Sequence, residues 1–170
     1  MAFDWKIEIS KMVYIKQTIA DLDHENLWTH SFSQVAATEN EIIQVEKNIG
    51  TPLDSTFKDF LLHANGWKGF YQSVDLFGTL DLLDEEKMRV AISLLDQTSM
   101  KSSNVNLECM LPIGATLVDL DVFCLDLRTG NIIWFAGNEI ERYPNFIEFF
   151  LTMLDYNREE VTDLKKNISK

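Results

Sequence analysis

A chain of 170 residues is long enough to bury a hydrophobic core without disulfides or metals, and its 46% hydrophobic and 25% charged residues are a usual globular mixture. Its 27 acidic residues against 15 basic ones give a formal net charge of −12. This charge argues against direct binding to nucleic-acid phosphates and favours encounters with basic protein surfaces, although acidity can also serve solubility alone.

The sequence carries no targeting or membrane signal. The N-terminal residues 1–6 lack a basic region followed by an apolar run, and no stretch approaches the roughly 18 apolar residues that a membrane helix needs. Cys109 and Cys124 match no metal or redox spacing and are expected to be buried free thiols. We therefore expect a cytoplasmic protein that does not bind membranes.

The first 36 residues are expected to form a helical extension that packs on the body of the protein. Apolar residues recur at helical spacing over 7–22 and predict a helix there. Residues 23–37 have no clear period, but they contain Trp28 and Phe32, which would be costly to leave in water. An ordered connector is therefore predicted over 23–37.

Two further helices have their own start and stop signals. Thr38 and Glu41 form a capping box, and Gly50 is expected to end that helix. Apolar residues at i, i+3, i+4 and i+7 over 57–64 predict the next helix. Asn65–Gly66 is expected to end it, because both residues accept the left-handed backbone conformation.

The middle of the chain mixes strand and helix signals. A β-like segment is predicted over 73–80, and a helix with an acidic first turn is predicted to start near Asp84. Residues 96–106 are polar and are expected to form a loop. The segment 107–136 is rich in β-formers.

Within that segment the pattern predicts a hairpin. Strands are expected over 117–127 and 132–135, joined by a turn at 128–131. A last helix is expected to be capped by Asn145, with Glu148 at its third position. The polar tail 158–170 is expected to fray.

These elements together predict a single-domain α+β fold with a central, mostly antiparallel sheet covered by helices. No internal repeat or linker divides the chain. The body of the domain is expected over 37–157, between the extension 1–36 and the tail 158–170.

No group of residues carries a recognisable catalytic or metal-binding motif. His24, His30 and His63 stand at no metal-ligand spacing, and nucleophile, phosphate-loop and dinucleotide motifs are absent. Asp119 and Asp121 share one face of a predicted strand, where they could form half of a cation site, an acid–base pair, or a solvated sheet face. We predict no bound metal, no cofactor and no enzymatic activity.

Several short motifs, taken in their order and spacing, resemble the SUKH superfamily over about residues 37–155. One departure is Asp54, which stands where the family usually has proline, with Pro52 displaced by two positions. The residues that carry the resemblance are Ile42, Glu46, Ile49, Gly50, Leu53, Phe57, Phe60, Leu61, Asn65 and Gly66, followed by Leu111-Pro112-Ile113-Gly114, Cys124-Leu125-Asp126-Leu127, Gly130, Ile132, Trp134 and Asn145-Phe146-Ile147-Glu148-Phe149-Phe150.

This resemblance implies an α+β fold and a role in binding. Bacterial members of the superfamily are mostly immunity proteins that neutralise a cognate toxin, often a nuclease, whereas some eukaryotic members regulate cell-wall synthesis and signalling. Two functions are therefore considered: an immunity protein for a basic nuclease toxin, and a non-catalytic regulatory adaptor. The compact pattern without disordered arms favours the first. The oligomeric state stays open.

A toxin is expected to meet an acidic face that carries an aromatic anchor. Trp67 is predicted to lie in a loop, where it could fill a pocket on the partner, whereas Trp134 is expected to lie in the core. The predicted partner-binding residues are Trp67, Asp81, Asp84, Glu85, Glu86, Asp119 and Asp121.

Overall fold

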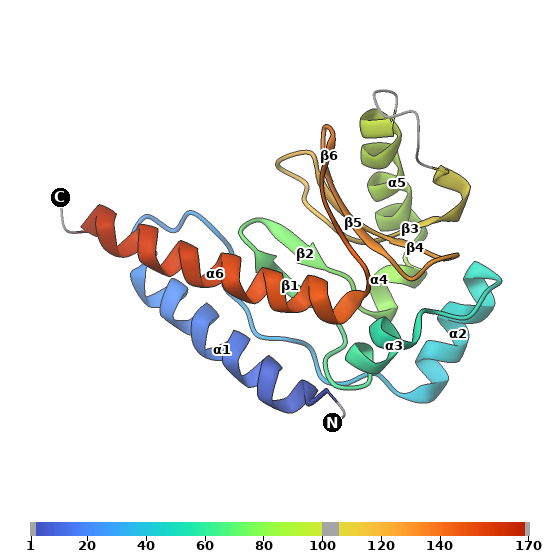
Figure 1. The fold of residues 1–170 in the computed structure, drawn as a ribbon, viewed down its shortest axis with the longest axis horizontal. Coiled ribbons are helices and arrows are strands. Elements are labelled where there is room, and N and C mark those ends of the chain that lie inside the picture. The colour runs from blue at the N-terminus through green and yellow to red at the C-terminus, as the bar shows by residue number, and fades with distance from the viewer. Residues whose placement is uncertain (1–2, 100–105, 169–170) are drawn as a thin grey trace.

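The computed structural model describes residues 3–99 and 106–168, and these form an α+β fold around one sheet (Figure 1). In chain order the elements are α1 (Trp5–Leu22), α2 (Glu39–Ile49), α3 (Ser55–Leu61), β1 (Trp67–Tyr71), β2 (Val74–Leu76), α4 (Thr79–Leu83), α5 (Glu85–Ser99), the 3₁₀ turn η1 (Leu107–Cys109), β3 (Met110–Ala115), β4 (Asp121–Asp126), β5 (Ile132–Ala136), β6 (Glu139–Tyr143) and α6 (Phe146–Ile168).

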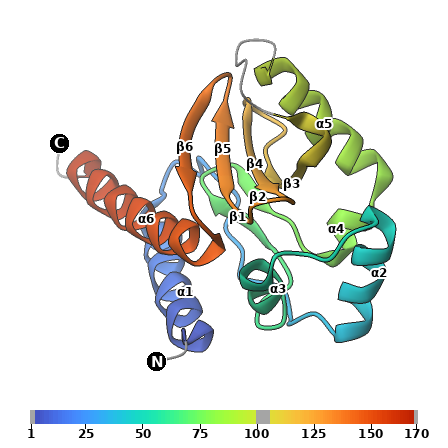
Figure 2. The same cartoon turned by 45° about the vertical axis from the view of Figure 1, so that its right-hand side comes forward.

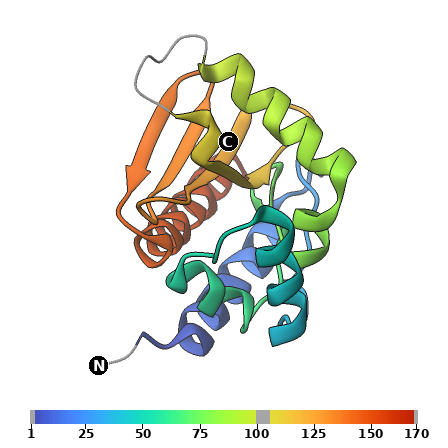
Figure 3. The same cartoon turned by 90° about the vertical axis from the view of Figure 1, so that its right-hand side faces the viewer.

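The sheet is a six-stranded meander in the order β1-β2-β3-β4-β5-β6, and every neighbouring pair is antiparallel. Helices α1 and α6 run side by side on one face, and α5 covers the other (Figure 2). Helices α2 and α3 lie together beyond one end of the sheet, as the view in Figure 3 shows. The predicted fold class is confirmed.

The core has one layer on each face of the sheet. The smaller layer joins α5 to the sheet through Leu95, Met110, Val122, Cys124, Ile133 and Phe135. The larger layer fills the space between the sheet and α1, α3 and α6, and its biggest rings include Trp5, Phe60, Phe123, Phe146 and Phe150. The extension that carries α1 is therefore part of the main core.

The helix starts follow the local sequence signals. The capping box of α2 is confirmed, because the Thr38 side chain accepts from the Glu41 backbone N–H and the Glu41 carboxylate accepts from the Thr38 N–H. Gly50 ends that helix with φ +75°, as predicted. Asp54 caps α3 by accepting from Thr56 N at 2.9 Å. An aspartate thus supplies a capping acceptor at the position where the related family usually has proline.

The predicted end of α3 at Asn65–Gly66 is wrong, because the helix ends at Leu61. Asn65 instead exchanges two side-chain hydrogen bonds with Thr79, which opens α4. Gly66 has φ +90°, and a Cβ there would lie 2.5 Å from the backbone nitrogen of Gly78. The Asn–Gly pair therefore permits a close approach of two backbone segments.

The strand predicted over 73–80 is also corrected. Its residues divide between β2 and α4, and β1 was not expected at all. Residues 117–120 form a bend that precedes β4, whereas a strand was predicted there, and β6 was missed. The loop predicted over 96–106 is wrong for residues 96–99, which belong to α5, while residues 100–105 lie outside the described residues.

The predicted fraying of the tail 158–170 is wrong up to Ile168, because α6 continues to that residue. Leu164 is 7% exposed in the main core, and α6 packs along the length of α1. The tail therefore contributes to the structure.

Replacing Leu164 should test that contribution. Leu164→Ala should lower the free energy of unfolding by about 2–3 kcal/mol, because it removes buried methyl groups and leaves a cavity. Ile168→Ala, at a position that is 51% exposed, should change it by less than about 0.5 kcal/mol. Urea denaturation of both variants measures the difference. Equal, small effects would mean that this turn of α6 does not hold α1.

Candidate partner-binding surface

Trp67 is not an exposed anchor. It opens strand β1, whereas a loop was predicted, and its side chain is 1% exposed. Its indole N–H donates to the backbone oxygen of Ser31 at 2.9 Å, and its ring packs 6.1 Å from that of Phe70. The side chain therefore fastens the connector to the sheet and is not available to a partner.

Asp119 and Asp121 are neighbours in sequence but have different surroundings. Asp119 is exposed in the β3–β4 bend, whereas Asp121 begins β4 and is half-buried. Burial raises the pKa of Asp121 and the Asp119 carboxylate adds to this rise, although Nε1 of Trp134 donates to Asp121 at 2.6 Å. Asp119 is therefore the more accessible of the two carboxylates. Trp134 is partly buried against the core, as expected.

The four acidic residues predicted around α4 and α5 do lie together. Asp81 is half-buried: it accepts from Gly78 N at 2.9 Å and pairs with Lys87 at 2.6 Å. Asp84, Glu85 and Glu86 are exposed, at the junction of α4 with α5 and in the first turn of α5. This acidic turn, residues 84–86, leads directly into the part of α5 that borders a surface groove.

That groove is a hollow of about 510 Å³ between four segments. The connector, the β1–β2 turn, α5 and the β3–β4 bend each contribute to its wall. Phe77 and Ala91, both 1% exposed, belong to its lining, and Lys87 lies 5.1 Å from the centre of the Phe77 ring. We call this hollow the connector groove.

The rim of the connector groove carries apolar side chains in water. Leu117 is 89% exposed, Val118 79% and Leu27 53%. Thr116 holds the bend in place, since its hydroxyl accepts from Val118 N and bonds the Ser73 hydroxyl at 2.9 Å. Apolar residues that an ordered bend keeps exposed beside a hollow are typical of an interaction site. Sequence reasoning missed them, because it placed residues 117–120 in a strand.

The connector is shaped by the buried carboxylate of Asp23. It accepts from Leu27 N at 2.9 Å, from Trp28 N at 3.2 Å and from Nε2 of His30 at 2.8 Å. Burial by itself would raise the pKa of Asp23, but these hydrogen bonds outweigh it and hold the pKa below its usual value. One charged group thus positions the wall of the groove that Leu27 and Trp28 form.

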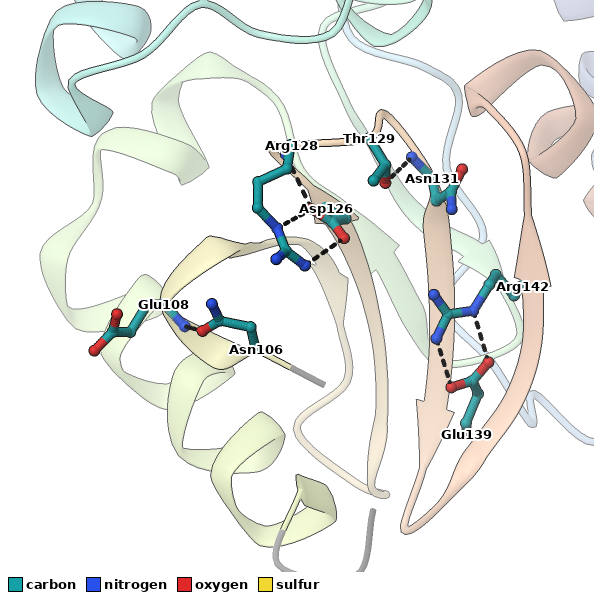
Figure 4. A network of polar contacts seen from close by, with 8 residues as sticks. All are labelled: Asn106, Glu108, Asp126, Arg128, Thr129, Asn131, Glu139 and Arg142. Atoms are coloured by element: carbon teal, nitrogen blue, oxygen red, sulfur yellow. Dashed lines mark hydrogen bonds and ion pairs between the residues drawn. The ribbon is translucent and has the colours of Figure 1, made fainter. Parts of the chain in front are cut away.

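Asp126, at the C-terminal end of β4, organises the β4–β5 turn in a similar way (Figure 4). This carboxylate is 3% exposed and accepts from the backbone N–H of Arg128 at 2.9 Å, and the Arg128 guanidinium also donates to it. The hairpin predicted at 128–131 is confirmed. The backbone N–H and the guanidinium of Arg128 occupy both carboxylate oxygens, so the role of Asp126 is to hold the β4–β5 turn.

Residues 3–99 and 106–168 contain no group of three or more His, Cys, Asp or Glu side chains that could hold a metal ion. In the same ranges no helix combines the length and apolar character needed to cross a membrane. His30 bonds Asp23, and His63 bonds the backbone oxygen of Asp59 at 2.8 Å.

Comparison with known proteins identifies the family. The model of the SMI1 / KNR4 family (SUKH-1) matches residues 36–152, which is more than half of the chain, so the protein belongs to this family. A crystal structure of a protein from Pseudomonas syringae pv. tomato aligns at 15% sequence identity with a TM-score of 0.48, covering 79% of this chain and 93% of that one. None of the curated proteins matches the chain significantly.

The hydrogen bonds of Asp23 give a pH-dependent prediction. A carboxyl group with a depressed folded-state pKa stabilises the fold above its unfolded pKa, near 3.9, and loses that contribution as the pH falls through the folded value. Asp23→Ala should therefore lower the free energy of unfolding by about 3 kcal/mol at pH 7, since three hydrogen bonds to a charged group are lost.

The gap between wild type and Asp23→Ala should narrow as the pH is lowered below about 4. Urea denaturation across a pH series measures this. A gap that stays constant down to pH 2 would show that the ionised carboxylate is not what holds the connector.

Proposed function

We propose that this protein is an immunity protein that binds and neutralises a cognate bacterial toxin with a basic nuclease domain. Membership of the SMI1 / KNR4 (SUKH-1) family is the observation that carries the proposal, because the superfamily comprises immunity proteins and regulators. The net charge of −12 supports a basic partner, which such a surface attracts and whose path to nucleic acid it can block.

The connector groove is the surface that best fits this role. Its rim carries the exposed apolar side chains of Leu117 and Val118, and acidic groups stand nearby in Asp119 and the turn 84–86. Buried apolar anchors within a charged rim are the usual arrangement of a tight protein interface. Val118, rather than Trp67, is the anchor that we assign.

The function is tested by co-expression. We expect a toxin gene in the reading frame next to this gene. That toxin should stop growth when expressed alone and should not do so when this protein is present. Purified, the two should form a complex in which the toxin is inactive. A protein that neither binds that toxin nor rescues growth would have to be assigned to the regulatory branch of the family.

The apolar anchor is tested against a control residue of similar exposure. Val118→Asp and Leu117→Asp should each weaken toxin binding at least tenfold, about 1.4 kcal/mol, because a carboxylate must then be buried in the interface. Val35→Asp is the control, since Val35 is also 89% exposed but does not line the groove. Unchanged melting temperatures would show that a loss of binding does not come from unfolding of the variants. Equal affinities for all three variants would place the toxin elsewhere.

The acidic rim should act mainly on the association rate. Changing Asp84, Glu85 and Asp119 to Asn, Gln and Asn should slow association and leave dissociation almost unchanged, because exposed charges steer encounters. Raising the salt concentration from 0.1 to 1 M should have the same effect in wild type, since the Debye length falls from ~10 Å to ~3 Å. Stopped-flow kinetics measures both. An association rate indifferent to salt would show that the acidity serves solubility only.

A further inference from the structure

A second groove, of about 810 Å³, lies between α1 and α6. The two helices run side by side on the face of the sheet opposite α5 (Figure 1). Ile7 and Tyr14 of α1 line the groove and are 53% and 75% exposed, and Val161 of α6 lines it as well. Two large side chains are thus kept in water on an ordered helix pair. We call this hollow the helix groove.

Every charged side chain that lines the helix groove is a cation: Lys6 and Lys11 from α1, and Arg158 and Lys165 from α6. This contrasts with the net charge of −12 for the chain. Lys11 also pairs with Glu8 at 2.7 Å, and Arg158 with Asp155 at 2.6 Å. The Arg158–Asp155 pair is exposed and therefore weak, so Arg158 can exchange its partner for an incoming carboxylate. The Lys11 side chain is 47% exposed, so its ammonium can meet a further carboxylate beside Glu8.

The helix groove is built wholly from residues outside the family match. Its lining lies within residues 6–18 and 158–165, whereas the family model covers residues 36–152. It is also separate from the connector groove, with which it shares no lining residue. The segments outside the family match therefore create a surface whose charged lining residues are all cations, in a chain with a net negative charge.

We propose that the helix groove is a second binding site that takes an acidic amphipathic helix of a partner protein. Its α1 wall extends from Lys6 to Thr18, about 18 Å at 1.5 Å per residue, which matches roughly three turns of a partner helix. Apolar side chains of that helix would lie on Ile7 and Tyr14, and its carboxylates would meet the cations at the rim. The hollow shape and the net negative charge of the chain disfavour a flat anionic membrane.

The proposal is tested with the full chain and a defined probe. The probe is a capped 14-residue peptide, held helical by a lactam bridge, with leucines on one face and glutamates elsewhere; its control carries lysines in place of the glutamates. Amide shifts in ¹⁵N spectra should change over residues 6–18 and 158–165 with the glutamate peptide. The lysine peptide should bind at least tenfold more weakly. No binding, equal binding, or shifts confined to other residues would overturn the proposal.

Matched variants keep the test independent of folding. Tyr14→Glu and Lys11→Glu should each weaken the binding of the glutamate peptide about tenfold. Lys11→Glu should also strengthen the binding of the lysine peptide. Leu80→Glu is the control for the first, because Leu80 is 76% exposed on α4, and Lys47→Glu on α2 is the control for the second. Controls that weaken binding as much as the groove variants would overturn the proposal.

The same variants can reveal two other occupants of the helix groove. Co-sedimentation with vesicles containing 30% phosphatidylglycerol, lost in Tyr14→Glu and without any preference between the peptides, would assign the helix groove to membranes. A dimer in sedimentation velocity that Tyr14→Glu dissociates would assign it to a second copy of this chain. Either result would overturn the proposal. Toxin binding through the connector groove should be unchanged in these variants, so failure here is distinguishable from failure of the proposed function.

Discussion

The packing of Trp5 against α3 and α6 is the contact on which both surfaces depend. Its ring is 1% exposed and lies 5.3 Å from that of Phe60 and 5.2 Å from that of Phe150, and its N–H donates to Asp59 at 3.0 Å. Burying such a large side chain supplies a substantial part of the free energy that holds α1 in place. The connector follows α1, and the hydrogen bonds of Asp23 at the end of that helix then position the wall of the connector groove.

A polar contact further along α1 then sets the register of the two helices. Lys16 is 4% exposed, and its Nζ lies 3.3 Å from the side-chain oxygen of Asn157. Asn157 in turn donates to the backbone oxygens of Phe70 and Met153. Burial lowers the pKa of Lys16 to about 8, against the opposing effect of the Glu160 charge. A buried cation is costly, so we interpret this contact as one that specifies how α1 sits on α6 rather than one that adds stability.

The sequence predicts those features whose energies are local. The α2 cap at Thr38 and its end at Gly50 depend only on residues within one turn, and both are present. The burial of Trp67 could not be read in the same way, because the partner that accepts from its indole lies 36 residues away. The sequence of the tail carries only a weak signal for a helix, namely that Leu164 stands one turn after Val161. The polar composition of residues 158–170 outweighed this signal and led to the prediction of fraying. The exposure of Val118 was hidden because an apolar residue in a strand-like pattern is normally buried.

The two grooves differ in the charge of their surroundings. The connector groove is lined partly by residues of the family match and is bordered by Asp119 and the acidic turn 84–86, whereas the helix groove has only cations among its charged lining residues. The cationic lining of the helix groove would disfavour a basic partner, whereas the connector groove has a mixed lining, with Lys68 and Lys87 beside Asp75, and owes its acidic character to Asp119 and the turn 84–86 around it. Trp5 joins α1 to the same core that supports the sheet, so the two grooves belong to one packed body. The connector lines the connector groove through Leu27 and Trp28, so we expect that substitutions confined to α1 and to the end of α6 would alter the proposed helix groove without disturbing the connector groove.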